Sequence, residues 1–226
     1  MCWCGSPEFA CSQTEDFRVD AGEFTLVGTS PFSQDRTCVT GEACAVGGFQ
    51  GQYLSGNDSL LVLETCGEPH ESGWTAEAQP AQSGLSKSPG WRFELVTASG
   101  GIYRLCWCGH LQPCDTAQQF RFDMGSLYLL GPSPLSQDRT CVSGRRCVVG
   151  SLTGLALPES EVVVLDTCGV STALPLAAPF PAALPAGFVA VSGTASCWPT
   201  PHLGHGECRA PGGQYRLCWC SSSRNT

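Results

Sequence analysis

The sequence predicts an all-β protein made of two tandem, disulfide-stapled antiparallel β-sandwiches with immunoglobulin-like architecture. Three observations support this fold class. A cysteine motif recurs along the 226 residues. Apolar and polar residues alternate over short windows that Gly, Pro, Ser and Asp interrupt, as in strands joined by turns. A unit of about 105 residues with turns every ~8–12 residues is the usual profile of a β-sandwich.

The repeat is defined by the tripeptide Cys-Trp-Cys, which stands at 2–4, 106–108 and 218–220 and which we call the seam. The cysteines between seams keep their order and almost their spacing in both repeats: Cys4, Cys11, Cys38, Cys44 and Cys66, then Cys108, Cys114, Cys141, Cys147 and Cys168. Ser-Gln-Asp-Arg-Thr-Cys-Val is identical at 33–39 and 136–142. Fixed spacing and shared text indicate tandem duplication of a covalent framework.

The seams divide the chain into segments. Residues 1–4 are expected to end a preceding repeat or to form a joining strand, 5–108 and 109–220 to form the two sandwiches, and 221–226 to be a tail or linker. The second repeat has a Pro-rich insertion at 170–187. Such a segment is expected to be extended, either as a surface loop or as an apolar strap on a neighbour.

The strands are expected where the alternation is clearest. Residues 17–28 and 120–131 each predict two short strands around a Gly turn, and 59–65 and 161–167 predict central strands rich in Val and Leu. In the seam strand, Tyr103, Leu105 and Trp107 should face the core while Arg104, Cys106 and Cys108 face away, unless a bulge reverses them.

The spacing favours one disulfide scheme, although sequence alone leaves other pairings open. The scheme joins Cys4–Cys11, Cys38–Cys44, Cys66–Cys106, Cys108–Cys114, Cys141–Cys147, Cys168–Cys218 and Cys197–Cys208. Cys2 and Cys220 are left over, one at each seam end. These two cysteines, with Trp3, Tyr215 and Trp219, are the candidates for contacts between repeats or protomers. A head-to-tail contact that does not close forms an open filament, and a terminal strand such as 1–4 or 215–220 could add to the next sheet.

Composition restricts the environment and the partners. Sixteen cysteines favour an oxidising, extracellular or cell-surface location. Twelve basic against 20 acidic residues argue against nucleic acid as a partner. No apolar run of ~18 residues predicts a membrane span, and no signal peptide opens the sequence, so we expect a piece of a longer chain.

Candidate chemical sites are weak. The four histidines lie outside the repeated blocks and no Gly-x-Ser-x-Gly is present, so we expect no enzyme and no cofactor. His202 and His205 stand between Cys197 and Cys208 in a zinc-like spacing, yet a disulfide would use both thiols. We therefore expect no metal.

Other motifs have structural or surface interpretations. Ser-Gln-Asp-Arg-Thr-Cys is expected to form a turn, or else an inter-unit contact repeated once per domain. Trp3, Trp107 and Trp219 are expected in the core beside disulfides, whereas Trp74, Trp91 and Trp198 are better candidates for exposure. Asn57 begins the sequon Asn-Asp-Ser and is a candidate glycosylation site.

The motif Gly-Gly-x-Tyr-Arg-Leu-Cys-Trp-Cys, with Cys44-x-Val-x-Gly48 and Val-Leu-Asp-Thr-Cys-Gly at 164–169, resembles a cysteine-rich tandem repeat of large extracellular proteins of algae and other protists. It is more loosely similar to modules of mastigoneme-type flagellar hairs. The resemblance implies surface or appendage proteins and no catalytic residues. We expect a structural protomer of an extracellular fibril or appendage that binds itself head to tail, and possible glycan ligands on 68–90 or 170–201 make an adhesin or carbohydrate-binding ectodomain the alternative.

Overall fold

The computed structural model describes residues 1–5, 11–69, 79–80, 90–140, 142, 152–157, 160–165, 167–170, 184–185 and 212–221. These residues contain β-strands and two short 3-10 turns, η1 (Thr14–Asp16) and η2 (Ala117–Gln119). The strands are β1 (Cys2–Trp3), β2 (Val19–Asp20), β3 (Gly28–Thr29), β4 (Arg36–Val39), β5 (Cys44–Val46), β6 (Gly51–Gln52), β7 (Ser59–Leu63), β8 (Gln79–Pro80), β9 (Trp91–Phe93), β10 (Gly101–Cys108), β11 (Phe122–Pro132), β12 (Gly154–Leu155), β13 (Ser160–Leu165), β14 (Leu184–Pro185) and β15 (Arg216–Ser221). The all-β class predicted from the sequence is confirmed.

The largest sheet has β10 near its centre. β10 pairs antiparallel with β7 on one side and with β11 on the other. β4 then pairs with the far side of β11 in parallel, so the expectation of purely antiparallel sheets is wrong at this position. The end of β11 pairs with β12.

A second, three-stranded sheet has the order β5-β9-β8. The main hydrophobic cluster combines residues of this sheet with residues of the larger one. Phe93 of β9, Leu105 of β10 and Leu127 of β11 are each fully buried in it. The core of the first repeat is therefore built between the two sheets.

The seam strand β10 buries both of its faces. Tyr103, Leu105 and Trp107 lie in the main cluster, as the alternation predicts. Cys106 and Cys108 point to the other face and are also fully buried, in a smaller cluster with Leu63 and Phe120. Phe120 belongs to the segment that follows the seam, so this segment covers the second face of β10.

The prediction of two short strands around a turn in 120–131 is wrong, because β11 runs through the segment without interruption. Gly125 is not a turn residue here. Its φ is +143°, and a Cβ at this position would lie 2.7 Å from the backbone nitrogen of Gln34. Glycine therefore permits close packing at the register shift between the two strands, where Arg104 and Cys106 of β10 lie opposite Ser126 and Asp123 and β11 has one additional residue.

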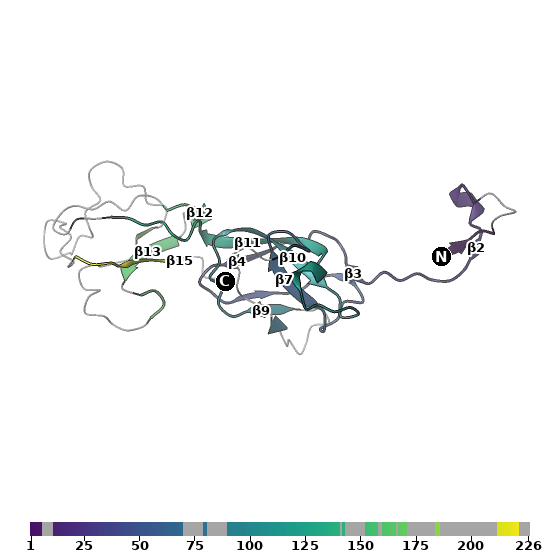
Figure 1. Ribbon diagram of the computed structural model, residues 1–226, viewed down its shortest axis with the longest axis horizontal. Helices are drawn as coiled ribbons and strands as arrows, with labels where there is room; N and C mark the ends of the chain where they lie inside the picture. The colour runs from purple at the N-terminus through teal and green to yellow at the C-terminus, as the bar shows by residue number, and fades with distance from the viewer. Residues whose placement is uncertain are drawn as a thin grey trace.

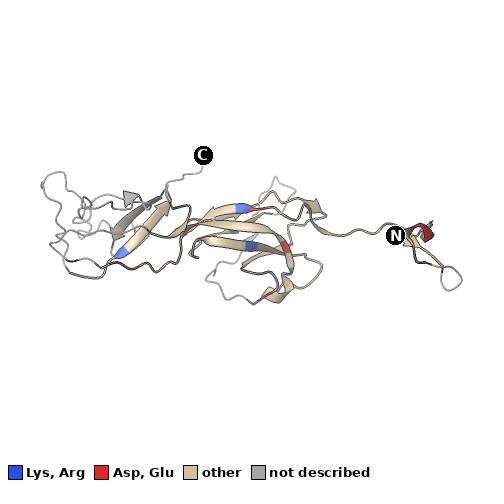
Figure 2. Ribbon diagram, turned by 90° about the horizontal axis from the view of Figure 1, so that it is seen from above, with Lys and Arg blue, Asp and Glu red and all other residues tan. Residues whose placement is uncertain are grey.

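The described parts form an elongated molecule (Figures 1 and 2). At one end, β1 pairs with β2, and an extended segment leads from this small unit to β3. At the other end, β13 pairs with β14 and β15. Acidic and basic residues are distributed along the length of the molecule (Figure 2).

Disulfides join Cys4–Cys11, Cys38–Cys44, Cys66–Cys106, Cys108–Cys114 and Cys168–Cys218. All five are pairs that the spacing favours. The expected pairs Cys141–Cys147 and Cys197–Cys208 lie outside the described residues.

Candidate inter-repeat junction

The feature that connects the two repeats is strand β11. By sequence it belongs to the second repeat, yet its residues 122–130 lie in the sheet of the first repeat, between β10 and β4. Met124, Leu127 and Leu129 of β11 are fully buried in the first repeat's core. The sheet therefore continues across the seam at Cys108, where the sequence period suggested a domain boundary.

Polar contacts fix β11 in its place. The Asp35 carboxylate accepts a hydrogen bond from the Ser126 backbone N–H at 2.7 Å. On the opposite edge, the Arg104 guanidinium donates to the Asp123 carboxylate at 2.7 Å and to the Ser126 hydroxyl at 2.8 Å. One charged side chain from each flanking segment thus recognises the inserted strand.

The Ser-Gln-Asp-Arg motif combines the two roles considered for it. Gln34 donates to the Gln50 carbonyl at 2.8 Å and accepts from the Gln50 N–H at 2.7 Å, which closes the local loop. Gln137 makes the corresponding pair of bonds with Thr153, each at 2.7 Å. The bond from Ser126 to Asp35 adds the inter-repeat contact.

Arg36, the last residue of this motif, contacts the segment 47–49. Its guanidinium donates to the Gly47 carbonyl at 2.7 Å and lies 4.3 Å from the ring centroid of Phe49. Burial lowers the pKa of Arg36, and the neighbouring Asp35 carboxylate partly offsets this effect. The group stays charged at neutral pH because an arginine pKa starts far above 7.

The pairing between β7 and β10 has a counterpart in the second repeat. β13 and β15 pair in the same register: Arg104 lies opposite Leu63, and the equivalent Arg216 lies opposite Leu165. Cys218 pairs with Cys168 as Cys106 pairs with Cys66. In the described residues, however, β15 is the edge of its sheet, in the order β14-β13-β15.

The pairing between β10 and β11 also has a counterpart, at the N-terminal end. Cys2 lies opposite Asp20 and Trp3 opposite Val19, as Cys106 lies opposite Asp123 and Trp107 opposite Phe122. The disulfide Cys4–Cys11 and η1 then follow, as Cys108–Cys114 and η2 do after β10. Residues 1–20 therefore repeat the start of the junction without the sheet that β11 completes.

The segment equivalent to the inserted part of β11 is 21–27, which forms no strand; Ala21 and Gly22 still bond to the backbone of Met1, and 23–27 has no strand pairing. Phe24 is 69% exposed and Leu26 is 76% exposed, whereas the equivalent Leu127 and Leu129 are fully buried. The same alternating pattern is therefore exposed at the start of the first repeat and buried at the start of the second.

The predicted contact residues are found at both ends of the molecule. Cys2 and Cys220 are free and exposed. Tyr215 and Trp219 are partly buried at the β15 end. Trp3 is 59% exposed, so its assignment to the core is wrong, because among the described residues β1 pairs only with β2 in a two-stranded sheet.

Trp91 was a candidate for an exposed, ligand-binding aromatic residue, and this prediction is also wrong. Trp91 is buried, packs against Phe49 with ring centroids 5.5 Å apart, and its indole N–H donates to the Asp58 carbonyl at 3.3 Å. The sequence signal that could have placed it inside is the alternation of Trp91 and Phe93 around Arg92. Trp74 and Trp198 lie outside the described residues.

The remaining predicted sites are surface or undescribed positions. Asn57 is exposed in the turn before β7. His202, His205, Cys197 and Cys208 lie outside the described residues, as do most of 68–90 and 170–201. Within the described ranges, His, Cys, Asp and Glu form no group of three or more that could hold a metal ion.

The chain matches no protein-family model, no curated protein and no solved structure. Among the residues that the structure describes, no helix has the length and apolar character needed to cross a membrane.

Proposed function

We propose that this chain is a structural protomer of an extracellular fibril or cell-surface appendage, built from tandem immunoglobulin-like β-sandwiches that join head to tail at their seams. The observation that carries the proposal is β11, which pairs with β10 and β4 of the first repeat and with β12 of the second. A single strand that belongs to two successive units makes their connection stiff. Stiff, directional connections suit a load-transmitting fibre.

The covalent framework supports the same function. Disulfides stabilise a folded unit outside the cell, where thiols are oxidised, and five are present in the described residues. Exposed Cys2 and Cys220 at the two seam ends are available for further links between protomers. Glycans at exposed Asn57 would decorate the side of such a fibre rather than its joints.

The test is whether the purified chain assembles without a ligand. We expect the sedimentation coefficient to rise with protein concentration and negative-stain images to show linear particles, with or without added glycans. A non-reducing gel then tells whether Cys2 or Cys220 links the copies. A chain that stays monomeric at every concentration and binds glycans would contradict the proposal and favour an adhesin or carbohydrate-binding ectodomain.

A further inference from the structure

Residues 23–26, which have no strand pairing, lie near one end of the molecule, and β15, the edge of its sheet in the described residues, lies near the other. These two segments are equivalent to the two sides of the contact between β11 and β10 within the chain. We propose that residues 23–26 of one copy insert beside residues 213–216 of a second copy, at the start of β15, as residues 126–129 of β11 insert beside 101–104 of β10. This inference rests on the proposed head-to-tail assembly and specifies its interface. The partner is a second copy of this chain.

The internal junction gives the register of the contact between copies. In the chain, Gly101, Ile102, Tyr103 and Arg104 lie opposite Leu129, Tyr128, Leu127 and Ser126. Transfer to the equivalent residues places Gly213, Gln214, Tyr215 and Arg216 of one copy opposite Leu26, Thr25, Phe24 and Glu23 of the next. This pairing is β-strand addition, in which backbone hydrogen bonds give affinity and alternate side chains give specificity.

The apolar surface of both partners matches this arrangement. Phe24 and Leu26 are alternate residues of an extended segment, so both would point to the same face of the completed sheet. On the acceptor, Leu217 is only partly buried, whereas its equivalent Leu105 is fully buried in the first repeat's core. Each copy would therefore bury apolar surface of the other, which is exposed or partly exposed in the single chain.

Charges on the two sides are complementary. Arg216 is exposed, and its equivalent Arg104 binds the Asp123 carboxylate. The residues that Arg216 would meet on the inserted strand are Asp20 and Glu23, which are both acidic and both exposed.

A second polar contact is available on the other flank of the inserted strand. Asp138 is exposed and is the equivalent of Asp35, which accepts the Ser126 N–H at 2.7 Å. Asp138 would accept the backbone N–H of Glu23 in the same way.

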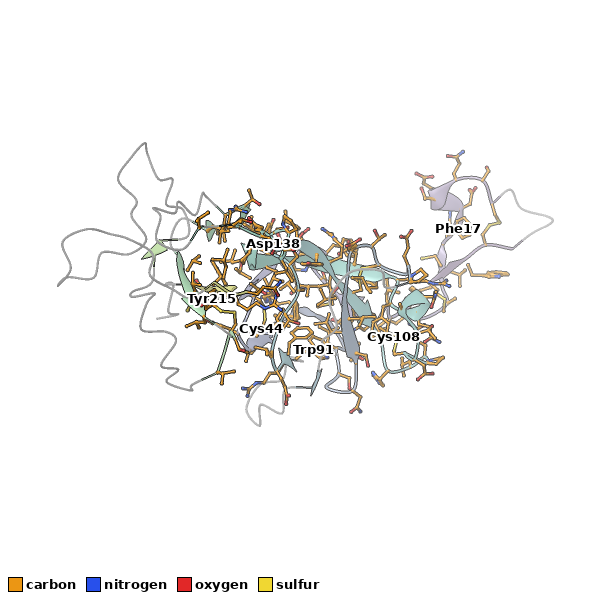
Figure 3. The ribbon with its side chains drawn as sticks, turned by 60° about the vertical axis from the view of Figure 1, so that its left-hand side comes forward. Phe17, Cys44, Trp91, Cys108, Asp138 and Tyr215 are labelled. Carbon is orange, nitrogen blue, oxygen red and sulfur yellow. A yellow bond between two sulfur atoms is a disulfide. The ribbon has the colours of Figure 1, made fainter. Side chains whose placement is uncertain are left out.

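The two contact segments lie at opposite ends of the molecule, so a chain cannot insert its own residues 23–26 beside its own residues 213–216. Figure 3 shows Phe17, which precedes residues 23–26, at one end, and Tyr215 and Asp138 toward the other. Figure 1 shows the same separation between β2 and β15. Donor and acceptor surfaces at opposite ends make a heterologous contact that propagates instead of closing.

One part of the interface is already occupied. β1 pairs with β2 at residues 19–20, which is where 218–220 of the preceding copy would lie in full register. Residues 213–216 need no such exchange, because their partners 23–26 have no strand pairing in the described structure, whereas Ala21 and Gly22 form backbone hydrogen bonds with Met1. Docking therefore begins on 23–26, and it extends into the seam only if residues 1–3 first separate from 19–22.

The experiment uses two variants of the full chain, each with one defective end. The donor variant carries Phe24→Asp and Leu26→Asp, and the acceptor variant carries Arg216→Glu and Asp138→Ala. All four positions are exposed, so each variant should keep the wild-type melting temperature. Leu111→Asp is the matched control, because Leu111 is 77% exposed but lies outside the proposed interface.

Sedimentation velocity and mass photometry then report association. We expect each variant alone to remain monomeric, an equimolar mixture to form a one-to-one dimer that cannot extend, and the Leu111→Asp control to assemble like the wild type. A donor variant that still forms filaments would overturn this interface and leave the fibril proposal standing. A mixture that dimerises, beside a wild type that never exceeds short oligomers, would keep the interface and overturn the fibril.

Discussion

Leu129 offers the sharpest test of strand sharing within the chain. It belongs to the second repeat by sequence but is fully buried in the core of the first. Leu129→Ala should therefore destabilise the first repeat. Truncating a buried leucine costs about 2–5 kcal/mol, because transfer free energy is lost and a cavity remains.

The matched control is Leu26→Ala, which changes the equivalent residue in the first repeat. Leu26 is 76% exposed, so in a dilute monomer this change should stay within about 0.5 kcal/mol. With a urea m-value of ~2 kcal/mol/M, the loss expected for Leu129→Ala lowers the unfolding midpoint by roughly 1–2.5 M.

The assay is urea unfolding followed by tryptophan fluorescence, because Trp91 and Trp107 are buried in the first repeat's core. The protein should be dilute enough to remain monomeric by sedimentation. Equal midpoints for Leu129→Ala and Leu26→Ala would refute the conclusion that β11 completes the first repeat.

Three further predictions concern single contacts. Asp35→Ala removes the acceptor of the Ser126 N–H, so the free energy of unfolding should fall by about 1 kcal/mol in urea melts. Asp58 is a buried carboxylate that accepts two hydrogen bonds from His110, at 2.7 and 3.1 Å. Asp58→Ala should therefore lower the free energy of unfolding by about 3 kcal/mol in the same assay. Burial, with a smaller contribution from a nearby carboxylate, raises the pKa of Tyr103. The unfolded chain should then ionise first, stability should fall as pH rises above about 10, and Tyr103→Phe should weaken that fall in melts across the alkaline range.

The sequence predicts the strand content well because apolar alternation and cysteine spacing are local signals. The Val- and Leu-rich strand β7, the inward face of Tyr103, Leu105 and Trp107, and the pairing of Cys66 with Cys106 all followed from such patterns. Each depends on residues of one repeat.

The sequence could not predict which repeat would bury each strand. Phe24 and Leu127 occupy the same position in nearly the same alternating pattern, yet one is 69% exposed and the other is fully buried. The difference arises from the presence of a preceding sheet, which no local pattern encodes. The same reason explains why Trp3 is exposed while Trp107 is buried.

Gly125 misled the strand prediction because glycine in an alternating segment is also typical of a turn. Its actual role depends on the backbone of Gln34, which lies in the other repeat. Contacts between repeats are thus the part of the fold that required the three-dimensional structure.

The most direct test of the shared-strand account is hydrogen–deuterium exchange of the wild-type chain at low and high concentration. The account predicts that amides of β11 are protected at both concentrations, because β11 is paired within the chain. Amides of 23–26 should exchange fast in the dilute protein and become protected, together with 213–216, as copies associate. If 23–26 stays unprotected in the assembled protein, or is already protected in the dilute monomer, the proposed insertion of this segment into a second copy is wrong.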